Sequence, residues 1–273
     1  MRYETIKELS DEEFKRATGV EPSSFQTMVE VVEKGLRKFG CPRKLSDQDQ
    51  VLLTLMYWRE YRTEFHIGLT YQVSESTVCR TIQKIENLLI KSKQFHLPGK
   101  KELQSGEASI EIVLLDATEQ AIERPKKKQR KHYSGKKRRH TQKAQVVANL
   151  KSKQIMATAF SKGSTHDFQL FKTSRSLPLA TTQIIADSGY QGLVKVHENS
   201  EIPTKKSKLH PLTAAQKAAN RALSRQRILI ENILRRLKVF RILSQRYRNR
   251  RKRFGLRFNL IAAIYNLELK TTA

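Results

Sequence analysis

The sequence predicts an α/β protein in which an all-α region precedes a domain built on a sheet. Apolar residues recur with the helical period across residues 46–90, whereas short apolar runs at 110–116 and 181–187 are typical of buried strands. Each of these runs ends in an aspartate. A chain of 273 residues with 38% hydrophobic residues can form two folded units.

The charge of the chain indicates a polyanionic partner. A formal net charge of +27 exceeds what solubility requires, and nucleic acid is the first candidate before an anionic membrane surface or an acidic protein. The sequence has no apolar run of about 18 residues and no signal-peptide pattern at Met1, so we expect an intracellular, cytoplasmic protein. Cys41 and Cys79 do not have the number or spacing of a zinc site or a disulfide framework.

Residues 1–40 are expected to form an N-terminal helical segment. Ser10 is a suitable N-cap before three acids, and a second helix is predicted at 23–38. The segment lacks the basic excess of the later chain, so we assign it to packing or oligomerisation and not to chemistry.

Residues 41–95 have the pattern of a helix-turn-helix domain. Helices are predicted at 46–61, 63–71 and 74–90, with Ser74 as the N-cap after a tight turn. In such a motif the second helix of the pair enters the major groove, and Arg80 could read a guanine. The side chains expected to face DNA are Ser76, Thr77, Arg80 and Lys84. The alternative is a plain three-helix bundle that packs on the next domain. Residues 96–109 are expected to be a linker.

A strongly basic loop follows the first predicted strand. Asp116 is expected at the C-terminal end of that strand, and residues 117–123 could continue it. No acid occurs between Glu123 and Asp167, and strands at 144–148 and 155–160 follow the basic run. Such a run is often only a solvated surface, but a basic hairpin beside a carboxylate suits phosphate binding. Its candidate contacts are Lys136, Lys137, Arg138 and Arg139.

The second predicted strand ends in Asp187 and is followed by a tight turn into a helix. Before it, Asp167 is well placed as an acid in the first turn of a helix. His166 and Asp167 are secondary candidates for contact with a metal or substrate.

Glu231 is an isolated acid on a basic helix. Apolar residues there recur with the helical period, at Ile230, Ile233, Leu234 and Leu237. A second face carries Arg227, Glu231, Arg235 and Lys238. One interpretation is that Glu231 only forms ion pairs with Arg227 and Arg235 along the helix. The other is that Glu231 is a metal ligand beside bound phosphates, with the basic residues contacting DNA.

Asp116, Asp187 and Glu231 together predict a metal-dependent phosphoryl-transfer site. The C-terminal edges of adjacent strands lie close together in an α/β sheet, so acids there could share divalent ions with an acid on a packed helix. Three carboxylates that hold two such ions are suited to in-line displacement at phosphorus.

Several motifs occur in the order found in a known family. The sequence resembles the DDE transposases of bacterial insertion sequences, most closely the insertion sequence 5 group. The matching parts are residues 114–119, residues 133–141, His166 and Asp167, residues 186–192, and the helix with Arg227, Glu231 and Lys238. Ser224 stands where the family signature has a tyrosine.

This resemblance implies a ribonuclease-H-like catalytic domain at 110–270, with a mixed sheet and flanking helices. It implies that Asp116, Asp187 and Glu231 are the catalytic triad, binding two Mg²⁺ or Mn²⁺ ions. The helix-turn-helix would bind terminal inverted repeats, and the enzyme would catalyse cut-and-paste transposition on double-stranded DNA as a homo-oligomer, at the bacterial nucleoid.

Two other functions remain open at the level of sequence. The protein could be a non-catalytic DNA-binding regulator or a decayed transposase copy, or it could be a nuclease of the same fold that acts on RNA or branched DNA. The helix-turn-helix favours duplex DNA over RNA, because the deep major groove of RNA does not admit a helix.

The basic stretch at 241–257 is expected to contact DNA backbone.

Overall fold

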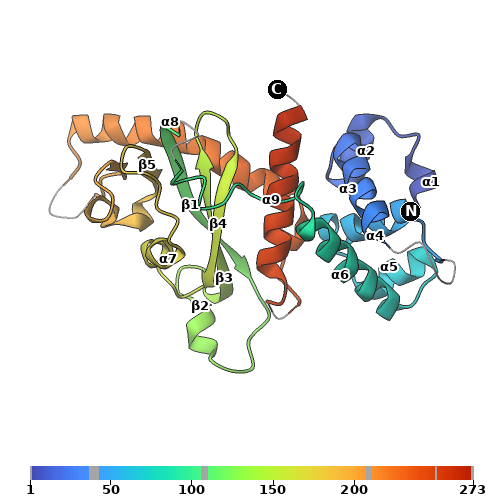
Figure 1. Ribbon diagram of the computed structural model, residues 1–273. Helices are drawn as coiled ribbons and strands as arrows, with labels where there is room; N and C mark the ends of the chain where they lie inside the picture. Colours follow the sequence, from blue (N-terminus) through green and yellow to red (C-terminus); the bar gives the residue numbers. More distant parts are fainter. Residues whose placement is uncertain (1, 37–42, 106–109, 207–210, 250, 272–273) are drawn as a thin grey trace. The chain divides into compact units, whose positions relative to one another are not determined.

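The computed structural model describes residues 2–36, 43–105, 110–206, 211–249 and 251–271 (Figure 1). The contacts divide the chain into two compact units. A helical unit comprises Met1–His96, Leu237–Gln245 and Leu256–Ala273, and a sheet unit comprises Leu97–Arg236 and Arg246–Gly255. No helix within the described ranges is long and apolar enough to cross a membrane.

The helical unit begins with the expected helical segment. Helices α1 (Tyr3–Ile6), α2 (Asp11–Thr18) and α3 (Pro22–Gly35) follow one another, and the end of the helix predicted to Lys38 lies outside the described residues. Ser10 forms a capping box with Glu13, as its position before three acids predicts. Gly19 ends α2 with φ of +87°, and a Cβ there would approach Arg59 Cδ to 2.9 Å. Glycine therefore meets both a backbone and a space requirement at this turn.

Three further helices confirm the helix-turn-helix. They are α4 (Asp47–Arg59), α5 (Glu64–Tyr71) and α6 (Glu75–Lys91). Ser74 Oγ accepts a hydrogen bond from the amide of Thr77, which caps α6 as predicted. Gly68 lies where the turn folds back, since a Cβ would come within 2.7 Å of the Val73 carbonyl oxygen.

The last helix, α9 (Phe254–Thr271), belongs from Leu256 onward to the helical unit. Arg257 Nε donates to Glu86 Oε1 at 2.6 Å, and the indole of Trp58 donates to the same oxygen at 3.1 Å. All three side chains are buried. The sequence gives no sign of this link, because a long-range ion pair leaves no periodic pattern.

The sheet unit contains a mixed sheet of the expected class. Its strands are β1 (Ile112–Ala121), β2 (Tyr133–Ser134), β3 (Arg139–Asn149), β4 (Ile155–Lys162), β5 (Gln183–Ala186) and β6 (Ser200–Glu201). The spatial order is β3-β1-β5-β6, and β2 and β4 also pair with β3. The pairs β1–β3 and β3–β4 are antiparallel, whereas β1–β5 and β5–β6 are parallel. This arrangement is the one expected of a ribonuclease-H-like domain.

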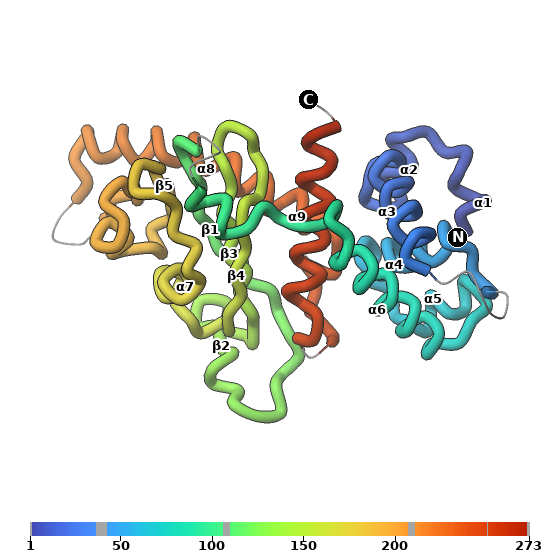
Figure 2. Tube along the Cα trace, in the orientation of Figure 1, coloured from blue at the N-terminus to red at the C-terminus, as the bar shows by residue number. Residues whose placement is uncertain are grey.

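Short helices and one long helix complete this unit (Figure 2). They are α7 (Asp167–Ser174), α8 (Ala214–Leu237) and the 3-10 turns η1 (Gln129–His132), η2 (Ser188–Tyr190) and η3 (Leu193–Lys195), while η4 (Arg241–Leu243) falls in the helical unit. One hydrophobic cluster packs strand residues such as Leu115 and Val147 against Phe171 of α7 and Tyr190. Leu103 from the predicted linker is part of the same cluster.

Two local predictions need correction. Asp116 is not at the end of its strand, because β1 continues to Ala121 while it pairs with β3. What ends near Asp116 is the parallel neighbour β5, whose last residue, Ala186, pairs with Leu115. The turn after Asp187 leads into the 3-10 turns η2 and η3 and not into an α-helix.

Replacing Arg257 by Met should destabilise the helical unit by about 3–5 kcal/mol, because the buried Glu86 carboxylate would lose a charged partner. Urea unfolding followed by circular dichroism measures this change. Lys7→Ala is the matched control: it removes an ion pair with Glu4 that is solvent-exposed, and should leave the midpoint nearly unchanged. Equal midpoints for Arg257→Met and the wild type would contradict the buried ion pair.

Candidate active site and DNA-binding surfaces

Asp116 and Asp187 lie side by side where β5 ends. Leu115 and Ala186 are paired in the parallel register of β1 and β5, so the next residue on each strand is an aspartate. Asp116 accepts a hydrogen bond from the amide of Ala117, and Asp187 accepts one from the amide of Ser188. Burial raises the pKa of Asp116 to about 6, and the nearby Asp187 charge acts in the same direction.

Arg227 on α8 connects Asp187 with Glu231. Its Nη1 is 3.6 Å from Asp187 Oδ1, and its Nη2 is 3.8 Å from Glu231 Oε1. The Arg227 side chain is only 13% exposed, whereas that of Glu231 is 58% exposed. Arg227 also favours the ionised form of Asp116 and so opposes part of the rise in its pKa. The Arg227 guanidinium group thus contacts two of the three predicted acids and acts electrostatically on the third, Asp116. Arg235 is exposed one turn beyond Glu231 on α8.

The site has suitable donors for a divalent metal ion but not a closed three-acid arrangement. Within the described part of the chain, no three His, Cys, Asp or Glu side chains are grouped so that they could hold a metal ion. Asp116 and Asp187 nevertheless provide adjacent carboxylate oxygens, which Mg²⁺ and Mn²⁺ prefer. Arg227 lies between Asp187 and Glu231, and its buried Nε has no hydrogen-bond partner among the described atoms. Asp116 and Asp187 therefore suit a divalent metal ion as ligands, and Arg227 supplies the positive charge beside them.

A second ionic cluster holds the start of α7. Lys143 Nζ is 2.8 Å from Asp167 Oδ1 and 3.6 Å from Glu119 Oε1, and Thr141 donates to the other oxygen of Glu119. Lys143 and Glu119 are directly opposed in the register of β3 and β1. Asp167 is therefore engaged by a lysine, while the His166 side chain is exposed. Sequence reasoning overlooked Lys143, although a lysine within an otherwise uncharged strand segment is a usable signal.

The turn after Asp187 packs closely against this cluster. A Cβ on Gly189 would come within 2.8 Å of Asp167 Oδ2, so glycine permits the contact. Tyr190 is buried, and its hydroxyl group is without a hydrogen-bond partner among the described atoms. Burial raises the pKa of this hydroxyl well above its usual value, and the negative charges of Asp167, Asp116 and Asp187 add to the effect.

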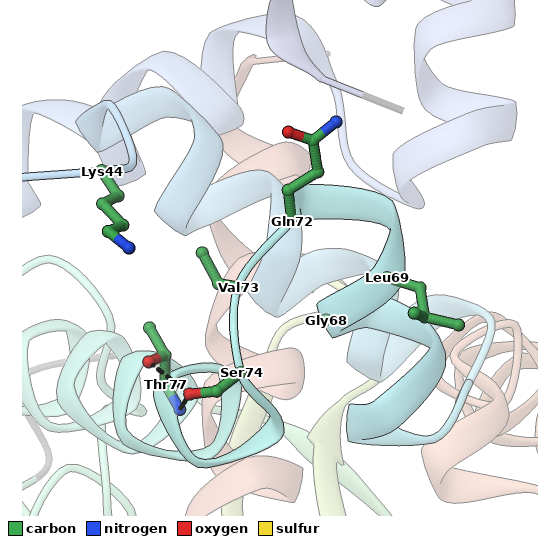
Figure 3. Close-up of a pocket in the computed structure, with 7 residues that line it drawn as sticks. All are labelled: Lys44, Gly68, Leu69, Gln72, Val73, Ser74 and Thr77. Atoms are coloured by element: carbon green, nitrogen blue, oxygen red, sulfur yellow. Dashed lines mark hydrogen bonds between the residues drawn. The ribbon is translucent and has the colours of Figure 1, made fainter.

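The predicted DNA-reading residues share the exposed side of α6. Ser76, Arg80 and Lys84 are exposed at successive steps of four, and Thr77 is half-buried with its hydroxyl 2.9 Å from Ser74 Oγ. A pocket of about 470 Å³ lies beside the α5–α6 turn (Figure 3). Its lining comes from the end of α5, the turn, the start of α6 and a lysine three residues before α4, namely Lys44, Gly68, Leu69, Gln72, Val73, Ser74 and Thr77.

The remaining predicted basic residues occupy two places. Lys136, Lys137, Arg138 and Arg139 are exposed at the tip of the β2–β3 hairpin. Lys238 follows the end of α8 and is grouped with the helical unit. In the basic stretch at 241–257, Tyr247 and Phe254 are buried against each other, and Arg250 lies outside the described residues.

The chain thus carries a helix-turn-helix followed by a mixed sheet with two adjacent aspartates, and sequence comparisons identify both parts. Residues 107–267 match the transposase DDE domain, and residues 43–94 match the helix-turn-helix of DDE superfamily endonuclease. The chain is 51% identical over 276 residues to "Probable transposase for insertion sequence element IS702" from Microchaete diplosiphon, with 100% of both chains covered.

This chain therefore belongs to the DDE transposase family, as its motifs predict. A structural comparison finds "Crystal structure of a pre-cleavage Mos1 transpososome" at 12% identity and a TM-score of 0.22, covering 87% of this chain and 80% of that one.

Asp116→Asn should stabilise the metal-free protein at pH 8. The folded-state pKa of about 6 lies above the ordinary 3.8, so ionisation of Asp116 costs stability as pH rises through this interval, by at most about 3 kcal/mol. Below about pH 4 the Asp116 carboxyl group is neutral, as the asparagine is at every pH. The difference in unfolding free energy between the variant and the wild type should then disappear. Urea unfolding in the presence of a chelator measures the effect, with the exposed Glu231→Gln as control. A less stable Asp116→Asn protein at pH 8 would contradict this placement.

Proposed function

We propose that the chain is an active transposase that binds the ends of its own element and catalyses metal-dependent DNA cleavage and strand transfer. The observation that supports this most directly is the adjacency of Asp116 and Asp187 at the end of β5, with Arg227 linking Asp187 to Glu231. In a protein that only binds DNA, carboxylates on the binding surface would repel phosphate.

Asp116, Asp187 and Glu231 would hold the two divalent ions, Mg²⁺ or Mn²⁺. When bound, these ions supply activation of a water or 3′-hydroxyl group and stabilisation of the leaving oxygen. Asp116 orients its carboxylate through the amide of Ala117, and Asp187 does so through the amide of Ser188. The Arg227 guanidinium group, which lies beside Asp187 and Glu231, would also suit a DNA phosphate because of its planar shape.

Recognition and chemistry would be divided between the two units. The α6 residues Ser76, Thr77, Arg80 and Lys84 would read the terminal inverted repeats in the major groove. Phosphate contacts would come from Lys136, Lys137, Arg138, Arg139, Arg227, Arg235 and Lys238. Bringing two DNA ends together requires two recognition surfaces, so we infer a homo-oligomer in the DNA complex. Its DNA partner would place it at the bacterial nucleoid. The proposed domains are the N-terminal helical segment at 1–40, the helix-turn-helix domain at 41–95, the linker at 96–109 and the catalytic domain at 110–270.

Asp187→Asn and Glu231→Gln should each lower the cleavage rate by more than ~10²-fold. Each removes a carboxylate that would bind metal directly, which should cost more than losing a residue that only hydrogen-bonds to a ligand. The measurement uses DNA carrying both ends of the element, with Mg²⁺ or Mn²⁺, and detects nicks on a denaturing gel. Both variants should bind this DNA at least as well as the wild type, since each removes a negative charge. Wild-type cleavage rates in Glu231→Gln would refute the assignment of the third acid.

The regulator or decayed-copy alternative makes a different prediction in the same assay. In that case the wild type and both variants would bind the DNA, and none would cut it. Ser224, exposed on α8 one turn before Arg227, would then be the first position to change to tyrosine.

Arg80→Ala should weaken binding to the element ends by about 1–3 kcal/mol and relax selectivity at one base pair. Lys84→Ala is the matched comparison on the same helix: it should weaken binding to all sequences similarly and reduce the slope of log K against log salt by about 1. Competition binding with end sequences mutated singly distinguishes the two effects. Unchanged base selectivity in Arg80→Ala would exclude it as a base-reading residue.

A further inference from the structure

Tyr133 is an exposed aromatic residue in the most basic part of the sheet unit. Its relative exposure is 45%, although tyrosine usually buries most of its ring. The exposed cations around it in sequence are Lys126, Lys127, Lys128, Arg130, Lys131, Lys136, Lys137, Arg138 and Arg139. Since no acid occurs between Glu123 and Asp167, the chain does not supply counter-charges within this segment. The segment forms the light-green loop and hairpin beside β2 (Figure 2).

The backbone around Tyr133 fixes its outward orientation. The neighbours His132, at the end of η1, and Ser134, in β2, are buried at 3% and 2% exposure, whereas Tyr133 between them is exposed. His132 Nε2 lies 2.7 Å from Arg251 Nη1, and burial and the Arg251 charge lower the His132 pKa, so the neutral ring accepts this hydrogen bond. Ser164 Oγ also donates to the Lys131 carbonyl oxygen at 2.7 Å.

A second ring accompanies Tyr133 at the base of the hairpin. Tyr133 and His140 are paired in the register of β2 and β3, and their ring centroids are 5.7 Å apart with an interplanar angle of 77°. His140 is half-buried and supports the tyrosine ring from one side. The phenol group therefore has a defined position, held by the backbone pairing and the neighbouring ring, while much of its surface remains in water.

We propose that Tyr133, supported by His140, is a stacking site for an unpaired base of a DNA strand whose phosphates contact the surrounding cations. Phosphate binding alone requires only lysine and arginine, and folding does not require an aromatic residue that is so exposed. Aromatic rings within cationic surfaces bind single-stranded segments by stacking, which is tolerant of sequence because every base has a π-face. The inference rests on the proposed function, because it needs a DNA substrate, and it adds a site specific for unpaired DNA.

The test compares a blunt duplex with the same duplex carrying a short unpaired extension that contains 2-aminopurine. The full-length wild type should prefer the extended DNA by roughly 5- to 150-fold, the range expected from stacking of one base, and should quench the 2-aminopurine fluorescence. Tyr133→Ala should lose both the preference for the extended DNA and the quenching, whereas Tyr133→Phe should retain both because it keeps the aromatic ring. Lys136→Ala, on the same hairpin, should weaken binding to both DNAs by the same factor.

The outcomes separate this inference from the proposed function. If the wild type binds neither DNA, the proposed function fails as well. If it binds the blunt duplex but has no preference for the extension, or if Tyr133→Ala retains the preference and the quenching, only the stacking site is overturned. Circular dichroism spectra and urea midpoints of the variants should equal those of the wild type, because Tyr133 is not part of the core.

Discussion

At the end of β5, the sheet unit must balance the negative charges of Asp116, Asp187 and Glu231. Two aspartates adjacent on parallel strands, with a glutamate nearby on α8, repel one another unless a cation lies among them. In the described structure Arg227 provides that charge, at 3.6 Å from Asp187 and 3.8 Å from Glu231. Its position requires α8 to pack through buried Ile230 and Ile233, which present Arg227 and Glu231 to the strand edge. The hydrophobic face of α8 and the ionic arrangement are thus linked.

Strand alternation explains why the acids of this unit form two groups. Asp116 and Glu119 differ by three positions on β1, so their side chains point to opposite faces of the sheet. Glu119 meets Lys143, which also binds Asp167 at the start of α7. Asp116 is directed to the other face, where Arg227 favours its ionised form while the charges of Asp187 and Asp167 oppose it. One group has a lysine as a fixed partner, whereas the other has an arginine that a divalent ion could replace.

The sequence was sufficient for those features that local patterns specify. Helical spacing and the N-cap at Ser74 predicted the helix-turn-helix, and apolar runs ending in Asp116 and Asp187 predicted adjacent strands. The position of Asp116 within β1 depends instead on the pairing of residues 117–121 with β3, which no local pattern of the sequence specifies. The contacts of Lys143 with Asp167 and of Arg257 with Glu86 join residues far apart in the chain, so no local pattern contains them.

We infer that Asp116 and Asp187 are ligands of the divalent metal ions and that Asp167 is not. Mn²⁺ titration followed by electron paramagnetic resonance tests this directly, because protein-bound Mn²⁺ loses the signal of the free ion. Asp116→Asn and Asp187→Asn should lose tight Mn²⁺ binding, whereas Asp167→Asn should retain it, because the native Asp167 carboxylate is engaged by Lys143. Undiminished Mn²⁺ binding in both Asp116→Asn and Asp187→Asn, or its loss only in Asp167→Asn, would exclude Asp116 and Asp187 as the metal ligands.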